Sequence, residues 1–462
     1  MNVKLKSSIN FILMRKTLIF PYIKYIKPSW YFNLNGTRSY PLWVNYDLLD
    51  LSVKKNIDFD EGYSSREAAL RDAAYQALCK GVISNDERLS LKQFDKVSLD
   101  DNYRFVRKYF NKYWALVILV IRFFSFCNPF KEIRAFAKTK NVRKINIYTS
   151  HIKYDNFLKD SQSLLSKNPK VSVIIPTLNR YFYLKDVLND LSRQTYKNFD
   201  VLVCDQTDPA DMEFYKQFKA LDLKVIVQEE KALWKARNRC IKESDSQFLL
   251  LFDDDSRVDP DWIVNHLRCL DFFDADISSG VSLSVVGAKI PENYSFFSRS
   301  DQLDTGNVLI RREVFSKVGL FDRQFEKQRM GDGEFGLRCY LEGITNISNP
   351  MAKRVHLKVS SGGLRQMGSW DGLRPKKLFA PKPVPSVLYL VRKYFGASTA
   401  FLLLLMEVPF SIMPYKYKGS VRYNLLSVIV FVLLFPIFGL QVYMSWRRAS
   451  KMLKEGALIE FL

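Results

Sequence analysis

Three consecutive aspartates, Asp253, Asp254 and Asp255, come directly after the apolar run at residues 248–252. Ionised carboxylates at this spacing repel one another, so the cluster needs a cation or another positively charged partner. Side chains two residues apart in an extended chain lie on the same side, which places Asp253 and Asp255 together. Mg²⁺ and Mn²⁺ favour hard oxygen ligands and fill their remaining positions with water and substrate phosphate oxygens. The spacing therefore predicts a divalent metal site for a diphosphate substrate.

Two other interpretations of the cluster stay open. A solvated acidic loop that begins a helix is one, because the sequence Asp-Pro-Asp-Trp at residues 259–262 is typical of a helix start. That interpretation accounts for Asp259 but not for three acids directly after an apolar strand. An aspartate phosphatase is the other, but it needs Thr or Val four residues after its nucleophilic Asp, and Arg257 stands there.

The elements around the cluster alternate between strands and helices. Short apolar runs at residues 171–175, 199–204, 224–228 and 247–252 are separated by helical patterns at residues 182–194, 211–221 and 231–244. This alternation predicts a parallel sheet with both faces covered by helices. Ligands of such sheets bind outside the carboxyl ends of the strands. We therefore expect the loops after Ile175 and Cys204 to share one edge with the aspartates.

The net charge of the chain limits the classes of partner that it is expected to bind. The chain has 462 residues, with 70 Lys+Arg against 48 Asp+Glu and a formal net charge of +22. This charge attracts phosphorylated substrates or anionic lipid. Nucleic acid is disfavoured because the chain has no zinc-finger spacing, RRM-like aromatic motif or basic repeat. The six cysteines show no CxxC pairing, which favours a reduced, cytosolic environment.

Residues 1–165 form a first region of unknown role. One helix is expected over residues 64–81, with a capping box from Ser64 to Glu67 and Gly81 as its stop. Residues 113–126 are apolar except for Arg122 and are too short to span a bilayer, which favours a buried or interfacial helix.

Residues 381–462 form a third region, predicted to anchor the chain in a membrane. Residues 425–446 carry no charge and would form a helix of about 33 Å, enough to span a bilayer. Residues 396–415 are nearly as apolar but contain Glu407, so they could span, re-enter or lie at the interface. Arg447 and Arg448 after the second segment favour a cytoplasmic C-terminus, whereas the basic residues between the segments leave the topology open.

The central region, residues 166–380, carries six motifs in order: VSVIIPTLNR, FDVLVCDQTD, KARNRCI, LLFDDDSRVDPDW, TGNVLIRREVFSKVGLFD and GDGEFGLRCYLEG. Over roughly residues 170–360 the chain resembles the family 2 glycosyltransferases of GT-A fold. The resemblance implies a Rossmann-like, mostly parallel sheet with helices on both faces. An α-rich N-terminal region and C-terminal membrane helices would flank this domain.

The resemblance also implies a nucleotide-sugar site. Asp253 and Asp255 match the family's DxD motif, with Asp254 as a helper, and His356 falls where relatives place a histidine near the metal. A structural role for His356 stays open. Gln206 stands where the family's second base-binding Asp usually lies. The residues implied at the nucleotide sugar are Pro176, Thr177, Asn179, Asp205, Gln206, Arg237, Asp253 and Asp254, with an exposed helix position as the alternative for Arg237.

The motif GDGEFGLR resembles the family's catalytic-base motif, with Gly331 in place of its first acid. An inverting transfer is a direct displacement that needs one carboxylate to accept the acceptor's proton and a metal to neutralise the departing diphosphate. Asp332 would be that base, kept ionised by the helix dipole, and an N-cap is its alternative role. Glu334 is expected to bind the acceptor or to order the loop.

Together these features predict an inverting glycosyltransferase that uses Mg²⁺ or Mn²⁺. It would move a sugar from a nucleotide-diphosphate donor to a glycan or lipid-linked acceptor at the cytoplasmic face of a membrane. A processive synthase is disfavoured because Ser369 replaces the Arg of the QxxRW motif. The alternative is a catalytically inactive GT-A-like membrane scaffold or glycan-binding subunit.

Overall fold

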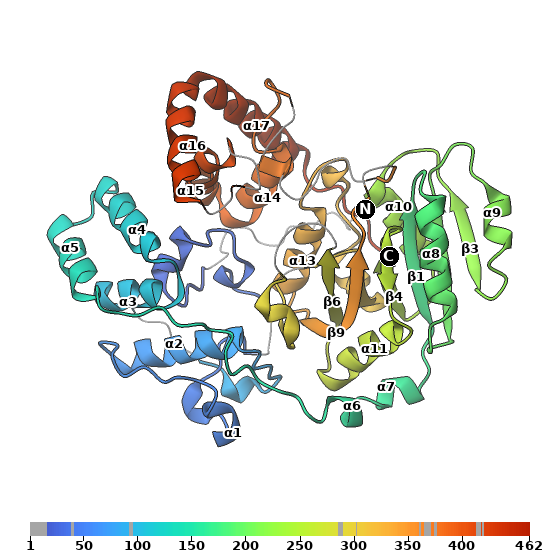
Figure 1. The fold of residues 1–462 in the computed structure, drawn as a ribbon, viewed down its shortest axis with the longest axis horizontal. Helices are drawn as coiled ribbons and strands as arrows, with labels where there is room; N and C mark the ends of the chain where they lie inside the picture. The colour runs from blue at the N-terminus through green and yellow to red at the C-terminus, as the bar shows by residue number, and fades with distance from the viewer. Residues whose placement is uncertain are drawn as a thin grey trace, which may run out of the picture. The chain divides into compact units, whose positions relative to one another are not determined.

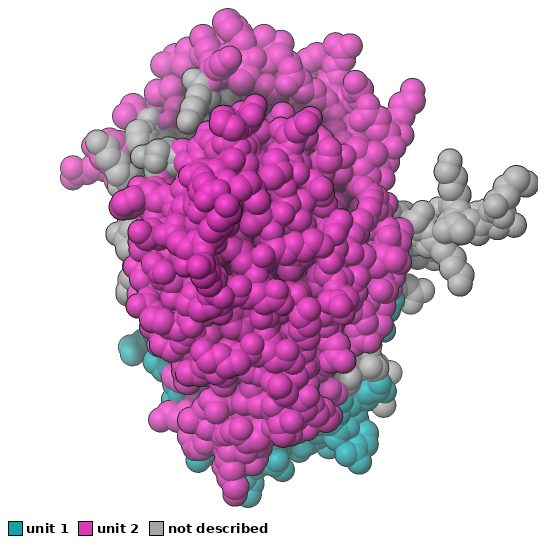
Figure 2. Space-filling view, turned by 90° about the vertical axis from the view of Figure 1, so that its right-hand side faces the viewer, with its two compact units in different colours: residues 1–150, 394–402 teal, residues 151–393, 403–462 magenta. Residues whose placement is uncertain are grey.

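The computed structural model describes residues 16–37, 41–91, 96–284, 290–301, 303–359, 362–364, 371–373, 377–412, 417 and 420–462. The chain divides into two compact units (Figure 2). The first comprises residues 1–150 with 394–402, and the second comprises residues 151–393 with 403–462. Three regions were expected from the sequence, whereas most of the C-terminal region belongs to the same unit as the central domain.

The second unit is built on a nine-stranded sheet of order β3-β2-β1-β4-β8-β6-β9-β5, with β7 paired to β9 (Figure 1). Its first four strands are β1 (Val171–Thr177), β2 (Phe199–Asp205), β3 (Leu223–Val227) and β4 (Phe248–Phe252). They are mutually parallel, and β1 aligns Thr177 with Asp205 and Ile174 with Leu251. The predicted strands and their common edge are therefore confirmed.

The rest of the sheet is mixed, which corrects the expectation of a mostly parallel sheet. Strand β8 (Asn307–Arg311) runs antiparallel to β4 and to β6 (Ile277–Ser284). Strand β9 (Asn346–His356) is parallel to β6 but antiparallel to β5 (Ser256–Val258) and β7 (Ser298–Arg299). Several of these strands mix Ser, Asn and charged residues with apolar ones, so they lack the continuous apolar run from which buried parallel strands are predicted.

Helices cover this sheet. Helix α10 packs on β1 and β2, and α11 packs on β6 and β9. The α-helices of the second unit that precede the C-terminal region are α6 (Phe157–Asp160), α7 (Ser163–Ser166), α8 (Tyr181–Ser192), α9 (Met212–Lys216), α10 (Leu233–Glu243), α11 (Trp262–Phe272), α12 (Arg312–Val318) and α13 (Gly331–Leu341).

The first unit is α-rich, as predicted. Its helices are α1 (Leu51–Lys54), α2 (Arg66–Cys79), α3 (Leu99–Tyr109), α4 (Lys112–Phe124) and α5 (Pro129–Lys138). The predicted helix start is wrong by one residue, because Ser65 rather than Ser64 caps α2 by accepting from the Ala68 N–H. The Ser64 hydroxyl instead donates to Asp101 at 2.5 Å, which removes it from the capping position.

The C-terminal helices are α14 (Pro385–Phe395), α15 (Ala397–Glu407), α16 (Val421–Leu433) and α17 (Phe435–Glu455). Among the described residues no single helix is long and apolar enough to cross a membrane, and α16 and α17 pass that test only as a pair bent by 85°. The straight spanning helix predicted for residues 425–446 is therefore wrong. The break falls at Leu434, and Pro436, which lacks the N–H needed to continue the hydrogen bonds of α16, stands in the first turn of α17, where a proline is tolerated. Helix α15, with 11 residues, is about 16 Å long.

Candidate active site

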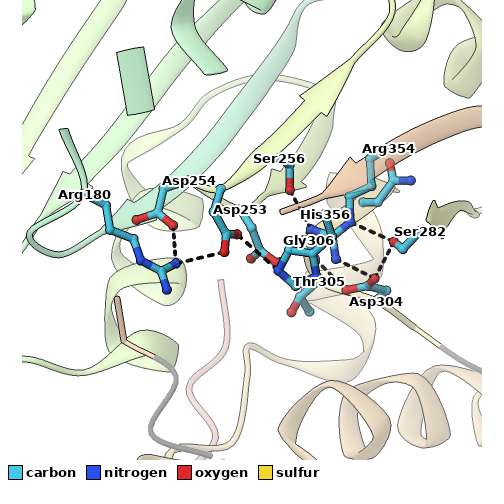
Figure 3. Close-up of polar contacts among 12 residues, drawn as sticks. Arg180, Asp253, Asp254, Ser256, Ser282, Asp304, Thr305, Gly306, Arg354 and His356 are labelled. Atoms are coloured by element: carbon cyan, nitrogen blue, oxygen red, sulfur yellow. Dashed lines mark hydrogen bonds and ion pairs between the residues drawn. The ribbon is translucent and has the colours of Figure 1, made fainter. Parts of the chain in front are cut away.

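The three aspartates lie in the loop after β4, and arginines relieve the repulsion between them (Figure 3). Asp253 accepts from Arg237 of α10 at 3.0 Å and from Arg354 of β9 at 2.8 Å. Arg354 also donates to Asp304 at 2.7 Å and to the Ser282 hydroxyl. Burial lowers the pKa of Arg354, but Asp304 and Asp253 outweigh it and hold that pKa above its usual value. Asp253 is therefore held between two guanidinium groups.

Asp254 is turned into the protein. Its carboxylate accepts from the Thr177 hydroxyl at 2.8 Å and from Arg180 at 2.9 Å. Burial raises the pKa of Asp254 to about 6, although Arg180 acts in the opposite direction. Asp254 is 4% exposed, and its predicted helper role at the nucleotide stays a prediction. Asp254 ties the loop after β1 to the loop after β4.

Asp255 lies beside His356. The antiparallel pairing of β5 with β9 aligns Ser256 with His356, and this brings His356 Nε2 to 3.2 Å from Asp255 Oδ1. Burial raises the pKa of Asp255, but the hydrogen bond and charge of His356, together with Arg180, bring it below its usual value. Asp255 is thus kept ionised in a nearly buried position.

Asp253, Asp255 and His356 form a possible metal site. One ligand atom from each of the three lies within 4.8 Å of the others. Two carboxylate oxygens and one imidazole nitrogen suit Mg²⁺ or Mn²⁺, whose remaining positions are filled by water or phosphate oxygens. The donor set therefore fits the predicted ions, and it is completed by a residue 101 positions along the chain from Asp255.

The loops after β1 and β2 are bonded to each other. The Asn179 N–H donates to the Thr207 hydroxyl at 2.9 Å, with Asn179 in the left-handed region at φ 53°. Pro176 and Thr177 are the last residues of β1 and are buried. Any contact of these two with a ligand therefore depends on the backbone.

Asp205, at the end of β2, is fully buried. Its carboxylate accepts from the hydroxyls of Tyr181 at 2.6 Å and Tyr215 at 2.8 Å, and from the Thr207 N–H at 2.9 Å. These three donors share Asp205 as their acceptor, and their hydrogen bonds hold the loop after β2 in place.

The side-chain oxygen and nitrogen of Gln206 differ in their hydrogen bonding. The side-chain oxygen accepts from the Ala232 N–H at 2.6 Å and from Gln228 at 3.1 Å. The side-chain nitrogen is buried and has no hydrogen-bond partner among the described residues. The hydrogen-bonding capacity left at Gln206 is therefore that of a donor, whereas an Asp at this position would offer only acceptors.

Asp332 lies in the first turn of α13 and lines a pocket. Its Oδ1 accepts from the Gly333 N–H at 2.8 Å. Arg237 lines the same pocket while it bonds Asp253 and the Thr305 carbonyl, so the pocket adjoins the acid cluster. The full lining is Leu233, Trp234, Arg237, Thr305, Lys327, Gln328, Arg329, Met330, Asp332 and Leu364. Three of these residues are cations, which suits an anionic ligand.

Two further expectations change with the structure. Arg237 is 1% exposed and lies over the Trp234 ring, which excludes an exposed helix position. Glu334 is fully buried and pairs with Arg338 at 2.9 Å and with Lys393 at 3.2 Å. A carboxylate in that position is not accessible to an acceptor, so ordering of the local structure is the role left to Glu334.

Sequence reasoning missed Arg180, Asp304 and Arg354, which surround the acid cluster. Arg180 directly follows Asn179 in a quoted motif, but a loop arginine has no pattern that marks it as an ion-pair partner. Arg354 lies in an 11-residue strand of mixed composition, and its pairing with Asp253 depends on the sheet order.

Comparison with known proteins identifies the domain around this site. Residues 172–319 match the sequence profile of the family described as Glycosyl transferase family 2. The chain is 27% identical over 167 residues to glycosyltransferase GlyA of Streptococcus pneumoniae, covering 35% of this chain and 22% of that protein. It is 27% identical over 175 residues to glycosyltransferase AglE of Haloferax volcanii, covering 34% of this chain and 58% of that protein. The matches thus span less than two thirds of the length of these relatives.

Solved structures resemble the chain more distantly. The crystal structure of Staphylococcus aureus TarS 1–349 with UDP-GlcNAc aligns with a TM-score of 0.43 and 16% identity, covering 63% of this chain and 97% of that one. The mannosyltransferase PcManGT of Pyrobaculum calidifontis, in complex with GDP-Man and Mn²⁺, aligns with a TM-score of 0.40 and 14% identity, covering 64% and 92%.

Proposed function

Residues 172–319 form a glycosyl transferase family 2 domain, and we propose that the chain is a metal-dependent inverting glycosyltransferase with a nucleotide-diphosphate sugar as donor. The observation that carries this proposal is the grouping of Asp253, Asp255 and His356 within 4.8 Å at the edge of the parallel strands. The pocket that Asp332 lines adjoins this group through Arg237.

In this proposal Asp253, Asp255 and His356 would hold Mg²⁺ or Mn²⁺, which when bound would supply positive charge for the departing diphosphate. The chain's own residues shape the rest of the donor site. Arg237 contributes a buried positive charge between the acid cluster and the pocket. A fixed guanidinium near the diphosphate stabilises the charge that develops as the sugar leaves.

Asp332 is proposed as the general base. The acceptor hydroxyl oxygen attacks the anomeric carbon, the bond from that carbon to the diphosphate oxygen breaks, and the hydroxyl proton moves to Asp332. The configuration at the anomeric carbon is inverted in this single displacement. Asp332 lies in the first turn of α13 and lines the pocket, which places its carboxylate to accept that proton.

For the acceptor we propose a growing surface glycan or a lipid-linked saccharide. Two matched relatives support this class by their names: the poly(ribitol-phosphate) beta-N-acetylglucosaminyltransferase TarS of Staphylococcus aureus and the O-antigen biosynthesis protein RfbC of Myxococcus xanthus.

We further propose that the enzyme works at the cytoplasmic face of a membrane. Leu425, Val432 and Leu433 of α16 are 62%, 64% and 73% exposed, and the net charge of +22 favours an anionic lipid surface.

The substitution Asp332→Asn tests the assignment of the base. The variant keeps the shape of the side chain but cannot accept the proton, so release of nucleoside diphosphate in the presence of a cell-envelope extract should fall by 100-fold or more, within the range of general-base effects. Donor binding, measured by calorimetry with Mn²⁺, should be unchanged. Wild-type turnover in the variant would exclude Asp332 as the base. A wild-type protein that neither binds nor turns over any donor would favour the inactive scaffold.

A further inference from the structure

Helix α4 of the first unit has an apolar outer face as well as an apolar inner face. On the inside, Ala115 and Ile118 are buried in a core with Tyr22, Tyr103 and Val106. The residues on the outside are 39–75% exposed: Tyr113, Leu116, Val117, Val120, Phe123 and Phe124. Their spacing of three, four and seven residues places them on one side of the helix. A surface helix of a soluble domain normally turns polar residues outward, so this face is suited to an apolar partner.

The apolar surface continues past the end of α4 into α5, which packs against α4 (Figure 1). Phe126 in the connection is 99% exposed, and Phe130 and Ile133 of α5 are 82% and 54% exposed. With about 200 Å² for a whole aromatic side chain, Phe124, Phe126 and Phe130 alone expose roughly 500 Å². Together with the outer side chains of α4, this exceeds the few hundred Å² that monomeric proteins usually expose in one patch.

The charges around this surface identify its partner. Between residues 112 and 144 the chain contains a single acid, Glu132. Glu132 is 1% exposed and pairs with Arg122 at 2.6 Å, so it adds no negative charge to the surface. The exposed charges of this segment are all cations, of which Lys138 pairs with Asp100 of α3: Lys112, Lys131, Arg134, Lys138, Lys140, Arg143 and Lys144.

We propose that α4, α5 and their connection, residues 112–138, form a monotopic contact that inserts its apolar face into an anionic lipid surface. Apolar and aromatic side chains would enter the headgroup boundary while the flanking cations meet anionic headgroups. A second copy of this chain is a poorer partner for the same face, because it would bring like charges together. The contact goes beyond glycosyl transfer.

Cys127 offers a local probe, because it lies between Phe126 and the start of α5. Four of the six cysteines are buried, and Cys79→Ser removes the other partly exposed thiol. The full-length protein, labelled at Cys127 with an environment-sensitive fluorophore, is mixed with vesicles of phosphatidylcholine with or without phosphatidylglycerol. We expect a blue shift with the anionic vesicles, quenching by lipids that carry a nitroxide on the acyl chain, and a weaker response at high salt.

A paired substitution tests the residues themselves. In Phe126→Ser/Phe130→Ser the vesicle concentration needed for half of the fluorescence change should rise about tenfold or more, as expected for the loss of two large apolar contacts. The matched control Leu51→Ser/Phe182→Ser changes two side chains that are 83% and 78% exposed elsewhere and should leave that concentration unchanged.

Three results would overturn the proposal. The emission of the label could stay unshifted, either because the protein does not bind the vesicles or because it binds them through another surface. It could be blue-shifted before lipid is added, which would mean that the chain or a second copy covers the face. Equal responses of the Phe126→Ser/Phe130→Ser and control variants would also contradict it.

Discussion

Arg354 is a buried ion-pair partner of the acid cluster. It is 2% exposed and bonds both Asp253 and Asp304. Removing Arg354 takes a cation from both Asp253 and Asp304. Arg237 is left as a partner of Asp253, but the loss of one partner of a buried ion pair costs more than the interaction itself contributes.

The substitution Arg354→Met should therefore lower the free energy of unfolding by about 3 kcal/mol. Urea denaturation followed by circular dichroism measures this change. As a control, Lys224→Met removes one partner of an ion pair whose side chains are 53% and 45% exposed, and it should change stability by less than about 0.5 kcal/mol. Equal effects of the two substitutions would show that Arg354 does not hold the cluster.

Single residues of the site were predicted unevenly. Asp253 and Asp255 stand out because acids directly after a buried strand need a partner, and Asp332 follows from the family motif. Asp254 looks equivalent to its neighbours in the sequence, yet the Thr177 hydroxyl and Arg180 turn it inward. Such differences depend on side-chain partners far along the chain, and a local pattern does not contain them.

Among the elements, the loop at residues 58–62 is tied to α3 by ion pairs. Asp60 bonds Arg104 at 2.6 Å and Lys108 at 3.0 Å. Although burial acts to raise the pKa of Asp60, the hydrogen bonds with these cations lower it to about 2.

A carboxyl whose pKa is lower in the folded than in the unfolded state stabilises the fold at pH values above its unfolded-state pKa. This contribution is lost as the pH falls through its folded-state pKa. Asp60 should therefore contribute about 2 kcal/mol that disappears between about pH 4 and pH 2. Unfolding by urea at pH 6 and pH 3 measures the loss, and Asp60→Asn should reduce the difference between the two. An unchanged difference in the variant would mean that other carboxyls set the acid sensitivity.

The predictability of the elements follows their composition. Strands β1, β2 and β4 are mostly apolar runs, and their parallel direction agrees with the prediction. Strand β9 mixes polar, charged and apolar residues, so its pairing with β5 has no sequence signal, and only the family resemblance placed His356 near the aspartates. The bend between α16 and α17 does have a sequence signal, since Pro436 lies two residues after the break at Leu434.

At the scale of the whole molecule, the last residues of the chain are hydrogen-bonded to residues 320–322 within the second unit. The Leu320 N–H donates to the Glu460 carbonyl at 2.8 Å, and the Leu458 N–H donates to Asp322 at 2.9 Å. Asp322 is nearly buried, and burial raises its pKa although this backbone donor acts against it.

Deletion of residues 457–462 should remove these bonds and lower the free energy of unfolding by about 2 kcal/mol, equivalent to a fall in Tm of roughly 3 °C for a unit of about 300 residues. Differential scanning calorimetry of the full chain measures the shift. Replacement of Leu462 alone, at 40% exposure, serves as the control and should have little effect. An unchanged Tm after the deletion would mean that the contacts of residues 457–462 add nothing to the stability of the second unit.

The central claim is that Asp253, Asp255 and His356 hold a divalent ion against a nucleotide diphosphate. The most direct measurement is the Tm of the wild type and of Asp255→Asn with UDP-, GDP- and dTDP-sugars, each with and without Mn²⁺. The account predicts that one class of donor raises the Tm of the wild type only when Mn²⁺ is present, because a ligand bound to the folded state alone stabilises it, and that Asp255→Asn removes this rise. A donor-specific rise that needs no metal, or one that Asp255→Asn retains in full, would contradict the proposed metal site.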